Sequence, residues 1–241
     1  MEVLEIKSLG KQFGGVTALS DVDVSIESDK IIGVIGPNGS GKTTLFNVIA
    51  GVHKPTAGRV IWRGKDITGA PTYKIARMGL VRTFQQAMSF PGLSVGENVR
   101  IACEHGRSHS GASKQIWSSP EEILNFVGLD ALGDELTGSL PFGNLRRLGI
   151  AVALGANPLL LLLDEPAAGL SDSETAELIE LILRFPKIGI GVCLIDHDML
   201  LMSTLCERLI VLNFGTKIAE GPPGLVLNDP KVTEVYLGRE I

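Results

Sequence analysis

The sequence predicts an α/β fold with a parallel core sheet, an N-terminal antiparallel β layer and a helical insert. Ile31 to Ile35 and Leu159 to Leu163 are uninterrupted apolar runs bounded by turn residues, which is typical of strands buried on both faces of a parallel sheet. Val3 to Leu9 alternates apolar and polar residues, as half-buried antiparallel strands do. From Ala87 to Gly138 the pattern changes to helix signals.

Size and composition fit this fold class. A chain of 241 residues can bury enough apolar surface to fold as one domain, and 44% hydrophobic residues with 29 glycines suit buried strands joined by tight turns. We expect a single domain over residues 1–241, with a core that includes the β layer formed by 1–86 and 139–241 and the helical insert at 87–138. The net charge of -5 lacks the basic excess that a nucleic-acid partner would need.

The first expected layer is antiparallel. Val22, Val24 and Ile26 repeat the alternation of Val3 to Leu9, so a second half-buried strand is predicted there. The N-terminal residues show no apolar signal segment.

A glycine-rich loop follows the first buried run and precedes an expected helix at Leu45 to Ala50. It matches G-x-x-x-x-G-K-[ST], the pattern of loops whose backbone N–H groups cradle phosphates at a helix N-terminus. The chemistry of such loops places Lys42 on the β and γ phosphates of ATP and Thr43 on Mg²⁺. The predicted ATP-binding residues here are Gly36, Pro37, Asn38, Gly39, Ser40, Gly41, Lys42, Thr43 and Thr44.

An acidic pair, Asp164-Glu165, ends the apolar run Leu159 to Leu163. Alone, such a pair is usually a solvated strand end. Beside a phosphate loop, it supplies what hydrolysis needs: Asp164 to hold Mg²⁺ and Glu165 to orient or deprotonate the attacking water.

The helical insert carries its own boundary signals. Ser94 with Glu97, and Ser119 with Pro120 and Glu122, are expected helix N-caps. Gly106 to Lys114 is a Gly/Ser-rich loop, where His105 and His109 lie four residues apart without a carboxylate and do not predict a metal site.

The remaining signals concern later strands, thiols and membranes. Gly191 to Ile195 and Arg208 to Leu212 look like further buried strands.

Three cysteines without metal-ligand spacing indicate reduced thiols. The most apolar stretch, Leu148 to Leu163, is interrupted by Gly155 and Pro158 and is too short to span a bilayer, so we expect a cytoplasmic chain with no membrane span of its own.

With these motifs in this order, the whole chain resembles the nucleotide-binding subunits of ABC transporters, which are P-loop NTPases. The resemblance implies that Phe13 stacks on adenine, that Gln85 contacts the metal and water, and that His197 is the switch histidine near the γ-phosphate. Without it, Phe13 would be read as a core residue, Gln85 as a solvated loop residue and His197 as a surface histidine.

Within that family, the sequence most resembles the ATPases of branched-chain amino acid uptake systems, with urea and amide importers as near relatives. The markers are Phe13-Gly14-Gly15, Arg82-Thr83-Phe84-Gln85, Ala167-Ala168-Gly169-Leu170 and Asp196-His197-Asp198-Met199.

The family's Leu-Ser-Gly-Gly-Gln signature is altered. It reads here Leu140-Pro141-Phe142-Gly143-Asn144. In the family this segment closes on ATP bound to the partner subunit, and proline offers neither hydroxyl nor N–H. We therefore expect weaker closure, and an unequal pair in which Lys42 serves the competent site. Ser171 replaces the family's aspartate and begins a capping box with Glu174, which leaves open whether it also contacts the partner.

The resemblance further implies an assembly. The partners would be a second ATPase subunit, expected to be a different chain, two integral membrane permease subunits and an external solute-binding protein, on the cytoplasmic face of the cell membrane. Two alternatives are a regulatory module that binds ATP with little or no hydrolysis, and a soluble ABC ATPase outside transport. The transported solute is not encoded in recognisable residues of this chain.

Overall fold

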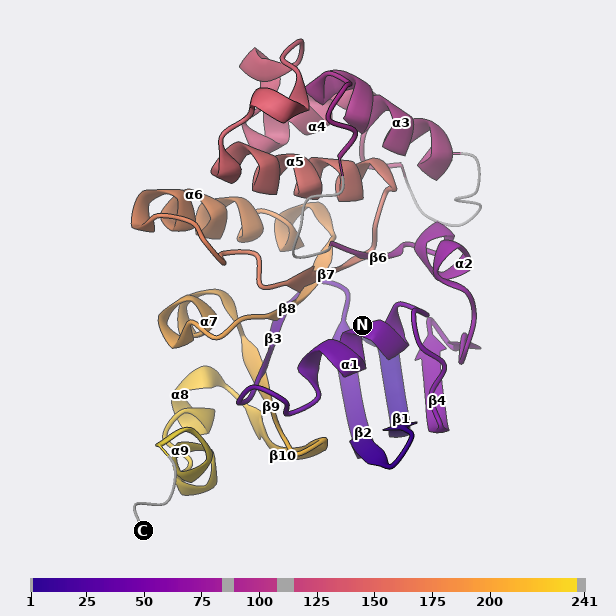
Figure 1. The fold of residues 1–241 in the computed structure, drawn as a ribbon, viewed down its shortest axis with the longest axis vertical. Coiled ribbons are helices and arrows are strands. Elements are labelled where there is room, and N and C mark those ends of the chain that lie inside the picture. The colour runs from indigo at the N-terminus through magenta and orange to yellow at the C-terminus, as the bar shows by residue number, and fades with distance from the viewer. Residues whose placement is uncertain (1, 84–88, 108–114, 238–241) are drawn as a thin grey trace.

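The computed structural model describes residues 2–83, 89–107 and 115–237. Helices and strands alternate along the chain after an antiparallel start (Figure 1). The strands are β1 Glu2–Phe13, β2 Val16–Glu27, β3 Ile31–Ile35, β4 Ala57–Trp62, β5 Lys65–Asp66, β6 Leu80–Arg82, β7 Leu160–Asp164, β8 Gly191–Ile195, β9 Arg208–Asn213 and β10 Thr216–Gly221. The helices are α1 Lys42–Ile49, α2 Thr72–Arg77, α3 Val95–Arg107, α4 Pro120–Val127, α5 Phe142–Gly155, α6 Asp172–Ile182, α7 Met199–Leu205, α8 Pro223–Val226 and α9 Pro230–Leu237, with short 3₁₀ turns at Asp130–Leu132, Thr137–Ser139 and Pro186–Ile188.

Two sheets form the frame. The larger has six strands in the order β10-β9-β3-β8-β7-β6, parallel except for the β9–β10 hairpin. The smaller is antiparallel, in the order β2-β1-β4-β5. The predicted parallel core sheet and N-terminal antiparallel layer are both confirmed.

The core strands are buried on both faces because each face has its own cover. Ile31 and Ile35 of β3 point into a cluster with α3 to α7, whereas Ile32 and Val34 point into a cluster with α1 and the small sheet. All five residues of β3 are buried. Helix α1, with Phe46 fully buried, thus lies between the two sheets.

The helical layer gathers on one side of the core sheet (Figure 1). Helices α3 and α4 pack against each other and against α5, which starts after the predicted insert has ended. The expected caps are present: Ser94 accepts from the N–H of Glu97, and Ser119 from that of Glu122. Short elements such as β4, β6 and α2 were not anticipated from the sequence.

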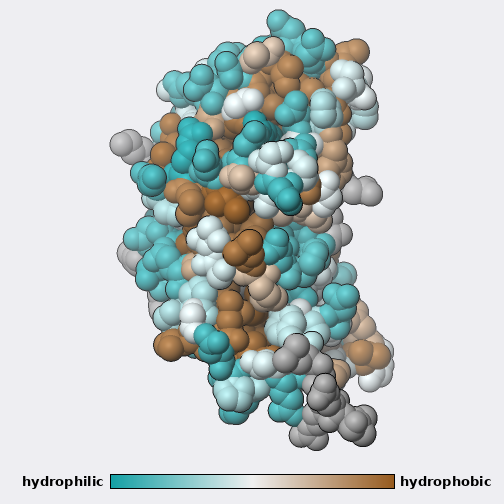
Figure 2. All heavy atoms as spheres, turned by 90° about the vertical axis from the view of Figure 1, so that its left-hand side faces the viewer, coloured by the Kyte–Doolittle hydropathy of each residue, from teal (hydrophilic) through white to brown (hydrophobic). Residues whose placement is uncertain are grey.

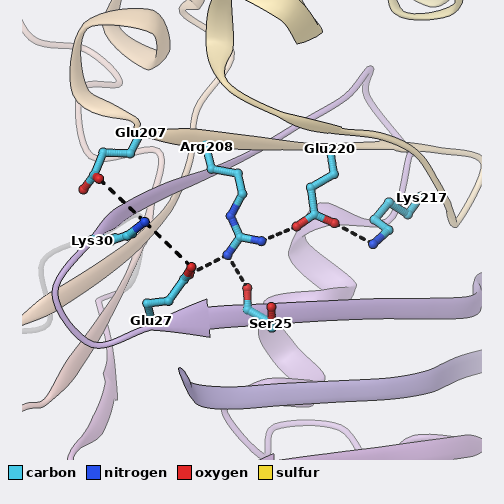
Figure 3. A network of polar contacts seen from close by, with 7 residues as sticks. All are labelled: Ser25, Glu27, Lys30, Glu207, Arg208, Lys217 and Glu220. Atoms are coloured by element: carbon cyan, nitrogen blue, oxygen red, sulfur yellow. Dashed lines mark hydrogen bonds and ion pairs between the residues drawn. The ribbon is translucent and has the colours of Figure 1, made fainter. Parts of the chain in front are cut away.

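One polar network ties the small sheet to the core sheet (Figure 3). The guanidinium of Arg208, at the start of β9, donates to the backbone oxygen of Ser25 at 2.7 Å and to Glu27 of β2 at 2.5 Å, and it also contacts Glu220 of β10. Lys217 in turn pairs with Glu220 at 2.6 Å. The three strands are therefore fastened at one point.

The surface mixes charged and apolar groups. On the face at the left of Figure 1, apolar patches interrupt the hydrophilic surface (Figure 2). Exposed large apolar residues include Phe142, Leu200, Phe214 and Leu225. No helix in the described part of the chain is long and apolar enough to cross a membrane.

Candidate active site

Three neighbouring strands, β3, β8 and β7, deliver the predicted site residues to one edge of the core sheet. The register pairs Val34 with Ile195, and Ile195 with Asp164. Because parallel strands end at a common edge, the segments after them emerge side by side. The phosphate loop, the acidic pair and His197 therefore meet there, although they come from distant parts of the sequence.

The backbone of the phosphate loop depends on its glycines. Gly41, the N-cap of α1, has φ +106°, and a Cβ at this position would lie 2.6 Å from the backbone oxygen of Ala18. No other residue type fits that conformation and that space. Because the cap is a glycine, the first N–H groups of α1 have no side-chain acceptor from it, as an anion-binding helix start requires.

Lys42 lies inside the loop. Its ammonium donates to the backbone oxygens of Gly36 at 2.7 Å and Pro37 at 3.1 Å. The pKa of Lys42 is lowered because the side chain is partly buried, and the negative charges of Glu165 and Asp164 offset only part of this shift. The lysine is thus held by the loop within the electrostatic reach of both predicted acidic residues.

Asp164 is almost fully buried and is held by Arg82, a residue that the sequence motifs did not single out as functional. Nη2 of Arg82 lies 2.7 Å from Oδ2 of Asp164, and the second oxygen, Oδ1, is buried with no hydrogen-bond partner among the described residues. A buried carboxylate oxygen is a hard ligand of the kind that Mg²⁺ prefers.

Glu165 adopts a left-handed backbone conformation, with φ +47°. Its N–H donates to the backbone oxygen of Ile195 on β8 at 2.8 Å, which fixes the turn at the strand end. The side chain is half-buried. Such a conformation in a residue other than glycine concentrates at functional sites.

His197 stands exposed beside a buried acid, Asp196. Nδ1 of His197 lies 3.6 Å from Oδ1 of Asp196, which also accepts from the backbone N–H groups of His197 and Asp198. Asp198 caps α7 through the N–H groups of Leu200 and Leu201. The histidine ring therefore extends from a rigid turn.

Arg146 is a second site residue that sequence reasoning missed. It lies on α5, donates to the backbone oxygen of Ala168 at 3.1 Å, and faces Glu165 and Asp196. The pKa of Arg146 is lowered because the side chain is partly buried, and the two carboxylates offset only part of this shift. The arginines after the signature were visible in the sequence, but only the fold brings one of them to the acidic pair.

Phe13 is 42% exposed at the end of β1. Its ring makes an edge contact with His53, at 5.2 Å between centroids, and Nζ of Lys11 lies 4.6 Å from its centroid. An exposed aromatic ring offers a stacking face for a base.

The altered signature starts α5. Pro141 is the N-cap and provides no side-chain hydrogen bond. Gly143 is buried against Glu174 of α6, and the half-exposed ring of Phe142 lies close to Gly169. The described contacts of this segment run to α6 and to the loop before it.

Gln85 lies outside the described residues, as does His109. His105 bonds the backbone of Ile101 within α3. In the part of the chain that the structure describes, no group of three His, Cys, Asp or Glu side chains could hold a metal by itself. A Mg²⁺ ion bound through one carboxylate, one hydroxyl, phosphates and waters needs no such group.

Helix α9 lies beside the phosphate loop, which no sequence motif indicated. Tyr236 lies on α9, and burial raises the pKa of its phenol to about 12, although a hydrogen bond with the backbone of Gly36 lowers it in part. Between loop and helix is a pocket of about 530 Å³, lined by Pro37, Asn38, Gly39, Ser40, Asn213, Phe214, Ile218, Lys231, Glu234 and Val235.

Sequence comparisons match two family models. Residues 19–168 match the ABC transporter family, and residues 216–241 match the branched-chain amino acid ATP-binding cassette transporter family. The chain is 37% identical to the high-affinity branched-chain amino acid transport ATP-binding protein LivG of Escherichia coli K12 and 35% identical to BraF of Pseudomonas aeruginosa, each over 98% of both chains. It is also 32% identical to the lipopolysaccharide export ATP-binding protein LptB of Haemophilus influenzae, over 100% of this chain and 99% of LptB.

Solved structures agree in fold. The ADP conformation of MJ1267, an ATP-binding cassette of an ABC transporter, superposes with a TM-score of 0.88 at 32% identity, covering 99% of both chains. A nucleotide-free ATP-binding cassette gives a TM-score of 0.86 at 32% identity, over 99% of this chain and 100% of that one. Sequence, fold and the convergence of motifs at one sheet edge agree, and the chain belongs to the ATP-hydrolysing, ATP-binding subunits of ABC transporters.

Proposed function

We propose that this chain hydrolyses ATP to drive the uptake of branched-chain amino acids or a related small solute, such as urea or an amide. The geometric observation that carries the hydrolytic part is the meeting of Lys42, the Asp164-Glu165 pair and His197 at one sheet edge. The match of residues 216–241 supports the amino-acid part, because it covers a C-terminal segment outside the general ABC match.

Each site residue has a different role in the proposed reaction. The loop N–H groups and Lys42 bind the phosphates, while Thr43 and Oδ1 of Asp164 hold Mg²⁺, which neutralises charge on the phosphates when bound. Glu165 takes a proton from the attacking water, and His197 contacts the γ-phosphate. Gln85 contributes to the metal and water shell, and Phe13 stacks on adenine.

A second ATPase subunit, a different chain, supplies its signature to the site on this chain, and the signature of this chain closes the site on that subunit. Exposed apolar residues near the motifs, Phe142 at the signature and Leu200 after His197, suit such a face. Because Pro141 lacks a hydroxyl and an N–H, Leu140 to Asn144 close the weaker of two unequal sites.

The permease partners dock on a groove between the ATP core and the helical layer. A pocket of about 440 Å³ lies there, lined by α2, α3 and α5 residues together with Val81, Arg82 and Thr83. The lining is mostly apolar, which suits a partner helix. With an external solute-binding protein, this assembly works on the cytoplasmic face of the cell membrane.

Reconstitution tests the function. The chain, its partner ATPase and the permeases are placed in vesicles with the solute-binding protein and labelled leucine or urea. We expect ATP-dependent uptake, reduced about 100-fold or more by Glu165→Gln because the water loses its base. ATP binding without turnover in the wild-type assembly would instead favour the regulatory module, and turnover without transport a soluble ATPase.

A second measurement tests the unequal pair. Lys42→Met is compared with the same change at the equivalent lysine of the partner subunit, in the assembled transporter. We expect the Lys42 change to reduce ATP hydrolysis more. Equal reductions would rule out the asymmetry.

A further inference from the structure

Arg82 connects two parts of the active site. Its side chain is 6% exposed, and its guanidinium uses different nitrogens for two partners. Nη2 bonds Oδ2 of Asp164 at 2.7 Å, and Nη1 bonds Oδ1 of Asn47 at 2.6 Å. Asp164 ends β7, whereas Asn47 lies on α1, the helix that begins at Lys42 (Figure 1).

The pairing leaves the two oxygens of Asp164 unequal. Oδ2 is taken by the arginine, and the buried Oδ1 has no hydrogen-bond partner in the described residues. A buried carboxylate held at one oxygen cannot rotate without breaking a charge-assisted bond, so its second oxygen keeps one position.

The backbone of Arg82 is also fixed. It ends β6 and pairs with Leu162 of β7, and the N–H of the next residue, Thr83, donates to the backbone oxygen of Leu162 at 2.9 Å. The ring of Phe46 lies 6.0 Å from the guanidinium carbon. The planar guanidinium group of Arg82 is therefore fixed both by its backbone and by the groups around it.

We propose that Arg82 is a positioning residue for ATP hydrolysis. By joining Asp164 to Asn47, it presents Oδ1 of Asp164 to Mg²⁺ and keeps that oxygen in register with the helix that starts at the phosphate loop. The proposal rests on the function proposed above, in which Asp164 holds the metal. Lysine cannot replace the fork, because a single ammonium lacks the planar geometry that spans both partners.

The test measures metal contact through binding. The full-length chain is prepared with Glu165→Gln to prevent turnover, and ATP affinity is measured by calorimetry with Mg²⁺ and with EDTA. The dissociation constant in EDTA divided by that in Mg²⁺ gives the factor by which the bound metal strengthens ATP binding. We expect Arg82→Met to reduce this ratio about 10-fold or more, since groups that orient a metal ligand typically contribute 10- to 100-fold. Affinity in EDTA should change less than about twofold, because the side-chain bonds of Arg82 described above run to Asp164 and Asn47 rather than to the phosphate loop.

Arg82→Lys keeps the buried positive charge, so it carries the test if Arg82→Met does not fold. We expect an intermediate ratio. In the Glu165→Gln chain, Asn47→Ala should lower the ratio when Arg82 is intact and have a smaller effect when Arg82→Lys is also present, because the two changes break one linkage.

The matched control is Arg208→Met, which breaks the partly buried arginine network of Figure 3 away from the site. It should lower the unfolding temperature and leave the ratio unchanged. If the Arg82 variants behave like Arg208→Met, Arg82 is structural only and the proposal is wrong.

Asp164→Asn separates failure of the proposal from failure of the function on which it rests. A ratio lost in Asp164→Asn but kept in both Arg82 variants would overturn the positioning role alone. A ratio kept in Asp164→Asn would remove the metal role of Asp164, and the positioning role with it.

Discussion

Lys42 and Glu165 show how single residues combine strain and charge at the site. Glu165 is held at φ +47°, a conformation that costs about 1–2 kcal/mol for a residue with a side chain. Lys42 is partly desolvated beside two carboxylates. Both features are unfavourable locally, and both place a charged group where the proposed hydrolysis of ATP would need it.

Lys42→Met removes the cation of the phosphate loop. A charged hydrogen bond contributes about 1.5–3 kcal/mol, so ATP affinity should fall by about 10- to 100-fold. Calorimetry on the isolated chain measures this. Lys30→Met, at a half-exposed lysine paired with Glu27, serves as the control and should bind ATP as the wild type does.

Pro141→Ser restores a hydroxyl and an N–H at the start of α5. If the signature is weak for the reason proposed, the variant should raise the ATPase rate of the assembled pair several-fold, by about 1 kcal/mol of added contact to the partner's ATP. Turnover of the assembled transporter measures this. An unchanged rate in a pair that still assembles would count against the proline as the cause.

At the scale of elements, helix starts determine where the site lies. Three of them matter: α1 has a glycine cap that leaves N–H groups for phosphate, α5 has a proline cap, and α6 has a complete capping box. In that box Ser171 accepts from the N–H of Glu174, and Glu174 accepts from the N–H and hydroxyl of Ser171. The box orients α6 beneath the buried Gly143 of the signature.

Ser171→Ala should lower the free energy of unfolding by about 1 kcal/mol, as loss of an N-cap does. Urea denaturation checks this. If Ser171 also contacts the partner subunit, the variant additionally reduces the ATPase rate of the assembled pair but not the ATP affinity of the isolated chain.

The same box predicts a pH effect. The hydrogen bonds from the backbone and hydroxyl of Ser171 lower the pKa of Glu174 below its ordinary value of 4.5. The stability that they contribute is therefore fully present above the unfolded-state pKa and lost as the pH falls through the lower folded-state pKa. Denaturation curves of Glu174→Gln and wild type should converge in that acidic window and differ at neutral pH.

At the scale of the whole molecule, two sheets enclose α1, and the network around Arg208 fastens them. Arg208 spans β2, β9 and β10, and its partner Ser25 lies 183 residues away in the sequence. The site lies on the core sheet and Phe13 on the small one. The relative position of Phe13 and the phosphate loop thus depends on this junction.

Arg208→Met should lower the free energy of unfolding by about 1–3 kcal/mol, less than a fully buried pair because the side chain is 21% exposed. Denaturation by urea, which is uncharged, measures the loss. The difference in stability between wild type and variant should change little when about 0.5 M salt is added, since partly buried ion pairs are screened weakly.

The sequence alone identified the phosphate loop, the acidic pair, the buried strands and three helix caps. These features are local: a left-handed turn favours glycine, a side-chain cap needs a short polar residue, and a doubly buried strand needs an apolar run. The resemblance to ABC transporter ATPases then made Phe13, Gln85 and His197 candidates. Their roles stay predictions, and Gln85 also lies outside the described residues.

Only the tertiary structure brought Arg82 to Asp164, Arg146 to Glu165 and α9 to the phosphate loop. Arg82 and Asp164 are 82 residues apart, and the pattern around either residue contains nothing that specifies the other. Which arginine faces which carboxylate is determined by strand order and register, and these depend on the summed packing of two cores. The sequence thus determined what the site is made of, and the fold decided which residues hold it in position.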